Sequence, residues 1–214
     1  MSNIVSEPVE NYIRATIRER EPFLQELEEY AHENIVPIIQ PEVAQLIRVM
    51  LNFQKPRKIL EVGTAIGYSS IVFAKSAGGE CEITTVERNE NIIPIAKENI
   101  KKSGFEKNIT ILEGDACEIL KELEGEYDMI FLDAAKGQYK LFFDLVFDKL
   151  KKGGLLISDN ILYKGMVASD EFAVKRKKTI IKRMRNYLDH ICSIDELETS
   201  IIPIGDGVAL SYKK

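Results

Sequence analysis

The sequence predicts an α/β protein with a mostly parallel sheet and helices on both of its faces. Five short apolar segments between residues 58 and 160 alternate with amphipathic segments of helical period. Strands that are apolar along their whole length are typical of parallel sheets, because crossover helices bury both faces. Two β segments close to the end of the chain raise the expected total to seven strands.

The elements of the parallel part follow one another at short intervals. Strands are predicted over 58–63, 82–87, 108–115, 127–133 and 154–160. Helices are predicted between them, over 69–77, 91–103, 117–123 and 139–150. The carboxyl ends of parallel strands meet at one edge of the sheet, and open α/β sheets bind their ligands at that edge.

The two ends of the chain follow other patterns. Residues 170–191 are predicted as one long helix, and strands over 197–204 and 208–212 flank the hairpin-type turn Gly205-Asp206-Gly207. Prolines divide the N-terminal helical segments at positions 22, 37 and 41. We therefore expect one domain over 1–214, with an N-terminal helical cap over 1–54 and the α/β core over 55–214.

Composition excludes several classes of protein. The 214 residues are 45% hydrophobic and 29% charged, which excludes wholesale disorder. No apolar run approaches the ~20 residues that cross a bilayer, and the first residues lack the pattern of a secretory signal. The three scattered cysteines indicate neither disulfides nor zinc. These features predict a cytoplasmic protein, and the net charge of -5 excludes a general nucleic-acid coat.

A glycine loop follows the first predicted strand. Gly63 and Gly67 flank it, and a helix is expected to begin near Tyr68. Glycines allow a ligand close to the backbone, and a new helix offers free N–H groups to an anion. The G-x-x-x-G spacing differs from the G-x-G-x-x-G of dinucleotide binders, which disfavours a nicotinamide dehydrogenase. A plain β–α turn remains the alternative.

Acidic residues end the next two strands. Glu87 lies 24 positions after Gly63, where an acid of a doubly wound sheet faces ribose hydroxyls. Asp115 ends the third strand, where it can meet an adenine edge or position a loop. The alternative for each is a solvated strand end.

Oxygen ligands gather at the ends of the fourth and fifth strands. Asp133 closes one, and Asp159 and Asn160 close the other. Such a set favours Mg²⁺, Mn²⁺ or Ca²⁺ over zinc, although Asp159-Asn160 alone can also cap a turn. Lys136 follows three residues after Asp133 and either assists the chemistry or is an ordinary surface lysine.

Together these segments resemble the cation-dependent, catechol-type O-methyltransferases, a family of class I S-adenosylmethionine enzymes. The motifs that carry the resemblance are ILEVGTAIGYSS (59–70), VERN (86–89), GDA (114–116), FLDAAKGQY (131–139) and GGLLISDNILYKG (153–165). The resemblance implies a Rossmann-like class I methyltransferase fold and a homodimer, with the N-terminal helices as candidates for the contact.

The resemblance also implies the site. Asp133, Asp159 and Asn160 would hold the divalent cation, with Lys136 and Asp133 as catalytic residues. S-adenosylmethionine would be bound by Ile39, Glu61, Gly63, Thr64, Gly67, Tyr68, Ser69, Glu87, Arg88, Asp115, Ala116 and Asp133. The cation would bind two neighbouring substrate oxygens and activate one of them for methyl transfer.

Local features favour the bacterial branch of the family that methylates 5-hydroxyuridine at wobble position 34 of tRNA. These features are Ala135, Tyr163 in a chain without tryptophan, and seven basic residues within 175–185. Outside that window the chain has 22 basic and 34 acidic residues, a net of -12, so the basic helix 175–185 is the expected docking site for the anticodon loop. A solvated face is the alternative for this charge run.

Two other functions stay open. One is a small-molecule catechol or caffeoyl-type O-methyltransferase with the same machinery. The other is a non-catalytic S-adenosylmethionine- or RNA-binding module, which the complete set of Asp133, Lys136, Asp159 and Asn160 disfavours.

Overall fold

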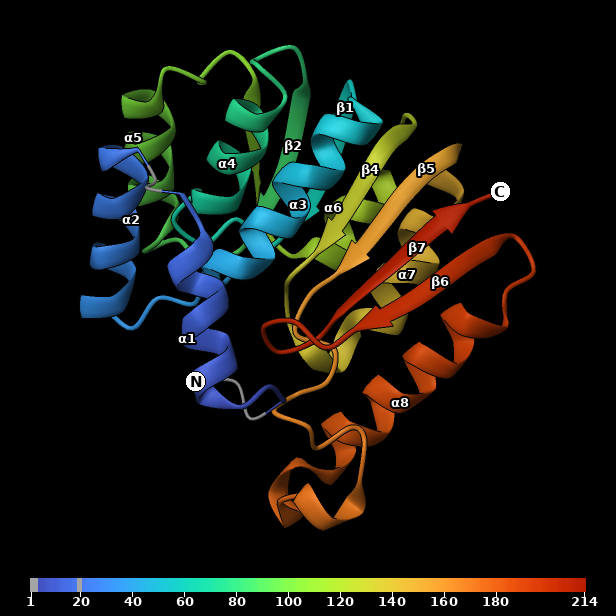
Figure 1. Cartoon of the computed structure of the whole chain (residues 1–214). Helices are drawn as coiled ribbons and strands as arrows, with labels where there is room; N and C mark the ends of the chain where they lie inside the picture. Colours follow the sequence, from blue (N-terminus) through green and yellow to red (C-terminus); the bar gives the residue numbers. More distant parts are fainter. Residues whose placement is uncertain (1–3, 19–20) are drawn as a thin grey trace.

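The centre of the molecule is a seven-stranded sheet with the order β3-β2-β1-β4-β5-β7-β6 (Figure 1). This computed structural model describes residues 4–18 and 21–214. The strands are β1 (Lys58–Val62), β2 (Glu82–Glu87), β3 (Ile109–Glu113), β4 (Tyr127–Leu132), β5 (Leu150–Ser158), β6 (Leu197–Ile202) and β7 (Val208–Lys213). The first five are parallel, whereas β7 runs antiparallel to both β5 and β6. The predicted α/β fold with a seven-stranded, mostly parallel sheet is confirmed.

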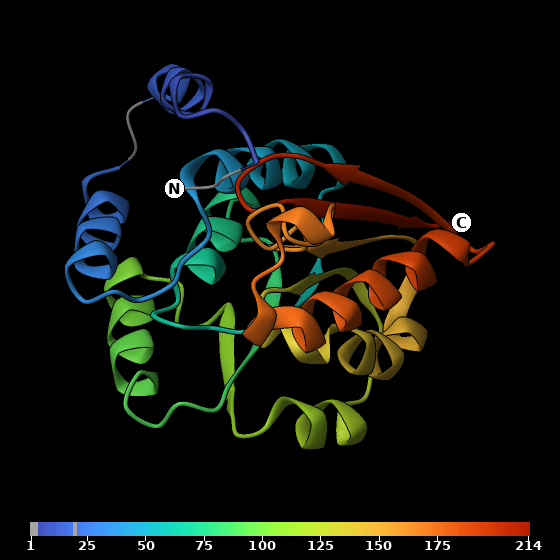
Figure 2. The same cartoon turned by 90° about the horizontal axis from the view of Figure 1, so that it is seen from below.

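Helices cover both faces of this sheet and bury two separate apolar cores (Figure 2). On one face lie α3 (Pro41–Gln54), α4 (Tyr68–Ser76) and α5 (Ile93–Ser103). On the other lie α6 (Ala116–Glu122), α7 (Tyr139–Val146) and α8 (Lys178–Ser193). The strands alternate between the two cores, since Ile59 of β1 faces the first and Leu60 the second.

Three helices precede the first strand. They are α1 (Glu7–Thr16), α2 (Pro22–Glu33) and α3. Pro22 and Pro41 each occupy the first position of a helix, where a missing N–H costs nothing, while Pro37 lies in the extended segment between α2 and α3. Residues 1–3 and 19–20 of the expected 1–54 cap lie outside the described residues.

The single long helix expected over 170–191 is wrong. Asp170–Phe172 and Lys175–Lys177 form two separate 3₁₀ turns, and the α-helix α8 begins only at Lys178. No residue between 170 and 180 is buried, whereas five side chains of α8 from Ile181 onward are. Because tertiary packing supplies most helical stability, the unburied segment does not continue the helix.

Smaller differences concern element ends. The helix expected over 139–150 ends at Val146, and the 3₁₀ turn Phe147–Lys149 leads into β5, which begins four residues before the predicted 154.

None of the helices in the described ranges is long and apolar enough to cross a membrane.

Candidate active site

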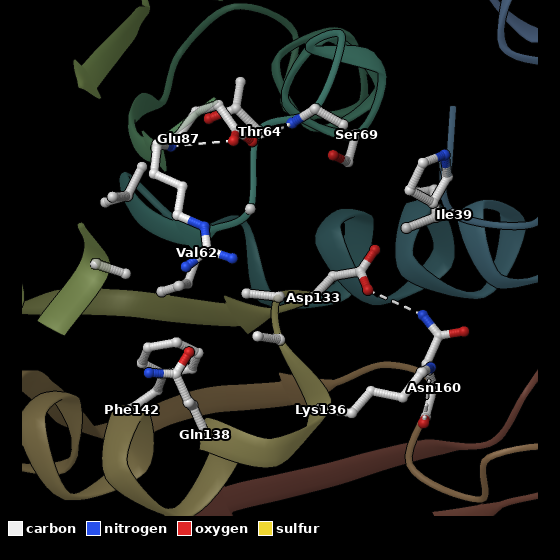
Figure 3. A pocket seen from close by; sticks show the side chains of 18 of the residues that line it. Ile39, Val62, Thr64, Ser69, Glu87, Asp133, Lys136, Gln138, Phe142 and Asn160 are labelled. Carbon is white, nitrogen blue, oxygen red and sulfur yellow. Dashed lines mark hydrogen bonds between the residues drawn. The ribbon is translucent and has the colours of Figure 1, made fainter. Parts of the chain in front are cut away.

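A pocket of about 430 Å³ opens at the carboxyl edge of the sheet (Figure 3). Its volume is within the range of small-molecule and cofactor sites. The loops after β1 to β5 line it, and the segment 37–39 closes it from the side of the N-terminal helices. Lining residues that the sequence singled out are Ile39, Gly63, Thr64, Tyr68, Ser69, Glu87, Arg88, Asp115, Ala116, Asp133, Lys136 and Asn160.

Three of the predicted residues lie behind the pocket wall. Gly67 is the N-cap of α4, and Asp159 is buried at the end of β5. Glu61 is fully buried in β1, where its Oε2 accepts hydrogen bonds from the hydroxyls of Ser70 and Thr85. Within residues 4–18 and 21–214, no hydrogen-bond partner reaches its Oε1. Burial raises the pKa of Glu61 to about 7, so a cationic ligand group near it would be favoured.

Gly63 allows the loop after β1 to lie very close to the backbone at the end of β4. Its φ of 109° is unfavourable for other residues, and an added Cβ would collide with the carbonyl oxygen of Asp133. The Gly63 N–H donates to Val86 O at 3.0 Å, which ties the loop to β2. The backbone after β1 therefore packs directly against the end of β4 and forms the pocket floor.

The acids after β2 and β3 both hold backbone groups. Glu87 accepts from the N–H of Ala65 at 3.0 Å through one oxygen, and from those of Arg88 and Asn89 through the other. The loops after β1 and β2 thus fix this carboxylate at the pocket, with lone pairs left for a ligand. Asp115 caps α6 by accepting from Cys117 N at 2.8 Å, so it does position a loop.

The expected cation ligands come together at the ends of β4 and β5. Asp133 Oδ1 accepts from the Asn160 amide at 2.9 Å, and Asp159 Oδ1 accepts from the Asn160 N–H at 2.7 Å. The buried Tyr139 hydroxyl donates to the backbone carbonyls that end both strands, at 3.2 Å (Leu132) and 2.7 Å (Asp159). The two neighbouring strand ends are therefore held in one unit.

Burial perturbs both carboxylates of this group. It raises the pKa of Asp133, and it raises the pKa of Asp159 further because the charge of Asp133 adds repulsion. A divalent cation would offset both effects, and the oxygen donor set fits a hard cation. No cluster of three or more His, Cys, Asp or Glu side chains that could hold a metal occurs in the described parts of the chain, so the amide oxygen of Asn160 would complete the set.

Lys136 is not an ordinary surface lysine. Its Nζ lies 3.3 Å from the carbonyl oxygen of Asn160 and 3.5 Å from Asp206 Oδ2. It also lies 5.4 Å from the centre of the Tyr163 ring. The side chain thus bridges the loops after β4 and β5 beside the two carboxylates.

Three further residues contribute to this site without having been predicted from the sequence. Gln138 lines the pocket from the 3₁₀ turn Lys136–Gln138, and Phe142 lines it from the first turn of α7. Their spacing of four was a usable signal, because it suggests one face of a helical segment after the fourth strand. Asp206 was interpreted only as a turn residue, and no local pattern indicates its contact with Lys136 across 70 positions of sequence.

The basic segment 175–185 lies beside the catalytic loops. Lys177 Nζ is 5.8 Å from the Tyr163 ring centre, and Arg183 donates to the carbonyl oxygen of Gly137 at 3.4 Å. Other cations of the segment are exposed, namely Lys175, Arg176, Lys178 and Lys182. The segment thus contacts the loops after β4 and β5 next to residues that line the pocket, and only residues from 178 onward belong to an α-helix.

Comparisons with known proteins give the family. Residues 14–214 match the family model described as O-methyltransferase. The chain is 32% identical over 178 residues to a caffeoyl-CoA O-methyltransferase of Stellaria longipes, a match that covers 78% of this chain and 73% of that protein. It is 27% identical to a catechol O-methyltransferase of Niastella koreensis, with 100% of both chains covered.

Solved structures agree with this result. A candidate caffeoyl-CoA O-methyltransferase from Staphylococcus aureus superposes with a TM-score of 0.91 at 35% identity, covering 97% of this chain and 100% of that one. An SAH-bound methyltransferase of Podospora anserina has the same fold at 23% identity, with a TM-score of 0.88 and coverage of 97% and 94%. The chain therefore belongs to the O-methyltransferase family and is an S-adenosylmethionine-dependent O-methyltransferase.

Proposed function

We propose that this methyltransferase depends on a divalent cation, Mg²⁺ or another hard ion such as Mn²⁺, held by Asp133, Asp159 and Asn160. The support is the pair of desolvated carboxylates with raised pKa values beside an amide group at the carboxyl edge of the sheet. When bound, such a cation supplies Lewis-acid activation of a substrate hydroxyl.

The chain's own residues orient the reactants and handle the proton. Among the described residues Glu61 Oε1 has no hydrogen-bond partner, so Glu61 behind the pocket wall and Gly63 in the wall suit the methionine end of the donor. Glu87 suits its ribose. Lys136 lies at the pocket wall beside Asp133. As a neutral amine its Nζ would take the hydroxyl proton, and as an ammonium it would offset the charge of the substrate oxygen. This arrangement favours substrates with two adjacent oxygens.

We infer that the substrate is 5-hydroxyuridine at wobble position 34 of tRNA. The observation that carries this inference is the basic segment 175–185, which meets the active-site loops at Tyr163 and Gly137. The 5-hydroxyl and 4-carbonyl of that base are neighbouring oxygens, and a loop base leaves its stack at low cost. The phosphates of the anticodon loop would contact the exposed lysine and arginine side chains of the segment 175–185. A tRNA substrate also implies a cytoplasmic location.

The test is nucleoside mass spectrometry of tRNA carrying 5-hydroxyuridine after incubation with enzyme, S-adenosylmethionine and Mg²⁺. We expect 5-methoxyuridine to form, and EDTA to prevent it. Enzyme that binds S-adenosylmethionine but forms no 5-methoxyuridine would reject the tRNA substrate. Retained activity in excess EDTA would reject the cation.

A second candidate substrate is a small catechol or a caffeoyl thioester. The relatives named caffeoyl-CoA and catechol O-methyltransferases favour it. A basic stripe also suits the phosphates of coenzyme A, so charge alone does not separate the candidates. Parallel assays with tRNA, caffeoyl-CoA and free catechol do, because free catechol offers nothing for the basic segment to bind.

We also propose a homodimer formed through the N-terminal helices. Their exposed apolar side chains support it: Tyr12 is 72% exposed, Val49 50% and Phe53 87%. Light scattering coupled to size exclusion should give twice the 24.3 kDa chain mass, and Phe53→Glu should lower it.

A further inference from the structure

The turn Gly205-Asp206-Gly207 connects the last two strands and reaches back to the active site. Asp206 is only 8% exposed, unlike a turn aspartate that faces solvent. We propose that Asp206 is a positioning residue that holds Lys136 and the loop 160–165 in their working arrangement. This inference rests on the proposed roles of Lys136 and Asn160.

The two oxygens of the Asp206 carboxylate bind two different loops. Oδ1 accepts a hydrogen bond from the backbone N–H of Lys164. Oδ2 lies 3.5 Å from Lys136 Nζ, and only 10% of the Asp206 side chain is exposed at this ion pair. One carboxylate therefore joins the loop after β4, which carries the lysine, to the loop after β5, which carries the proposed cation ligands.

The loop after β5 has an unfavourable backbone that needs such support. Asn160, Tyr163 and Lys164 have positive φ angles of 58°, 47° and 57°. Non-glycine residues rarely adopt this region, and they keep it only where the surroundings fix it. The backbone of the turn supplies two more contacts, because the carbonyls of Asp206 and Gly207 accept from the N–H groups of Leu162 and Ile161 at 3.0 Å each.

The turn is itself wedged in place. A Cβ added to Gly207 would collide with the Leu162 side chain, and one added to Gly205 would lie 2.6 Å from Val43 of α3. The turn thus packs closely between the loop 160–165 and α3. The loop 160–165 and α3 therefore hold the turn that carries Asp206 on two sides. A residue that sets the position of a lysine needs such support.

The charge of Asp206 is tested by Asp206→Asn, which keeps an oxygen for Lys164 N but removes the charge that faces Lys136. We expect kcat to fall about tenfold or more, with KM and S-adenosylmethionine affinity unchanged. Asp206→Glu, which keeps the charge, should recover part of kcat. The matched control is Asp144→Asn, because Asp144 pairs with Lys140 on the exposed face of α7 and should leave kcat unchanged.

A second measurement does not depend on activity. Amine labelling of the apo protein, followed by peptide mass spectrometry, reports how accessible and how nucleophilic each lysine amine is, and both are lowered when a carboxylate holds the lysine in an ion pair. We expect Asp206→Asn to raise labelling of Lys136 several-fold and Asp144→Asn to raise that of Lys140 only, while Asp206→Glu labels like wild type.

The two readouts separate the inference from the proposed function. If wild-type enzyme methylates none of the substrates, the proposed function fails, and the labelling still decides whether Asp206 holds Lys136. Unchanged Lys136 labelling in the folded Asp206→Asn protein would overturn the inference, and so would a wild-type kcat in that variant. Circular dichroism establishes that each variant is folded.

Discussion

At the scale of single residues, the buried Glu61 carboxylate links cofactor binding to stability. Burial raises the pKa of Glu61 from 4.5 to about 7. Between these values the folded chain binds more protons than the unfolded chain, so stability of the free enzyme falls as pH rises through this window. Above pH 7 the ionised Glu61 lowers the free energy of unfolding of the free enzyme by up to ~3 kcal/mol. A cationic ligand group beside the carboxylate would offset this loss.

We therefore expect Glu61→Gln to stabilise the free enzyme at pH 8 and to flatten its pH dependence between about 4.5 and 7. The same change should weaken S-adenosylmethionine binding at least tenfold, since the carboxylate that suits the donor's amino group is lost. Denaturant titrations across pH and calorimetric titration of the donor measure the two effects. Glu82→Gln, at an exposed glutamate, is the control, and equal pH profiles for wild type and Glu61→Gln would contradict the prediction.

A change at Asp159 tests the proposed cation site separately from binding of the methyl donor. Asp159 is buried and does not line the pocket. We expect Asp159→Asn to abolish methyl transfer at limiting Mg²⁺ and to weaken Mn²⁺ binding at least tenfold, because one of two carboxylates loses its charge. Stabilisation by S-adenosylmethionine should remain as in wild type.

Calorimetric titration with Mn²⁺ and thermal shifts with the donor check this prediction. Asp148→Asn changes an exposed carboxylate and should behave as wild type. Undiminished Mn²⁺ affinity in Asp159→Asn would remove this residue from the cation site.

At the scale of elements, strand positions were predictable and part of the C-terminal helix was not. Each parallel strand is an apolar or β-branched run with an acidic or glycine residue at or just after its carboxyl end, such as Glu87 or Asp133, so the pattern indicates both the strand and the edge of the sheet. Residues 170–177 offer charge and helical propensity, but none of their side chains is buried, and without buried packing the α-helix does not extend through them. Asp206 reaches Lys136 only because β7 pairs with β5, a register that no local pattern reveals.

The basic segment 175–185 yields a prediction at this same scale. Lys175 and Lys178 are exposed and lie outside the pocket. The double change Lys175→Glu and Lys178→Glu should lower methylation of tRNA more than tenfold, because it puts two repulsive charges against the phosphates. Free catechol, if it is turned over, should be methylated at the wild-type rate.

The matched control reverses the charge of two other lysines, Lys101→Glu and Lys102→Glu, which are exposed on α5. It changes net charge equally at another place, so it separates local docking from total charge. Equal losses of tRNA methylation in both double variants would contradict docking at 175–185. A loss with caffeoyl-CoA that exceeds the loss with tRNA would favour the thioester as substrate.

At the scale of the whole molecule, charge is distributed very unevenly. The net charge of -5 is the sum of +7 within residues 175–185 and -12 over the rest of the chain. An acidic body repels nucleic acid in most orientations, while one basic stripe attracts it in a single orientation. This charge distribution favours the binding of one RNA segment at one place, the basic segment 175–185.

The salt dependence of tRNA affinity measures how many phosphate contacts the bound tRNA makes. We expect tRNA affinity to fall steeply between 50 and 200 mM salt, because each phosphate contact adds roughly 0.7–0.9 to the slope of log K against log salt. S-adenosylmethionine affinity should change little, since most of the residues proposed to bind it line the pocket. The Lys175→Glu and Lys178→Glu variant should lose about 1.5 from the slope, whereas reversal of Lys101 and Lys102 should leave it unchanged. Fluorescence anisotropy of labelled tRNA over a salt series measures each slope, and identical slopes in all three proteins would show that tRNA binds elsewhere.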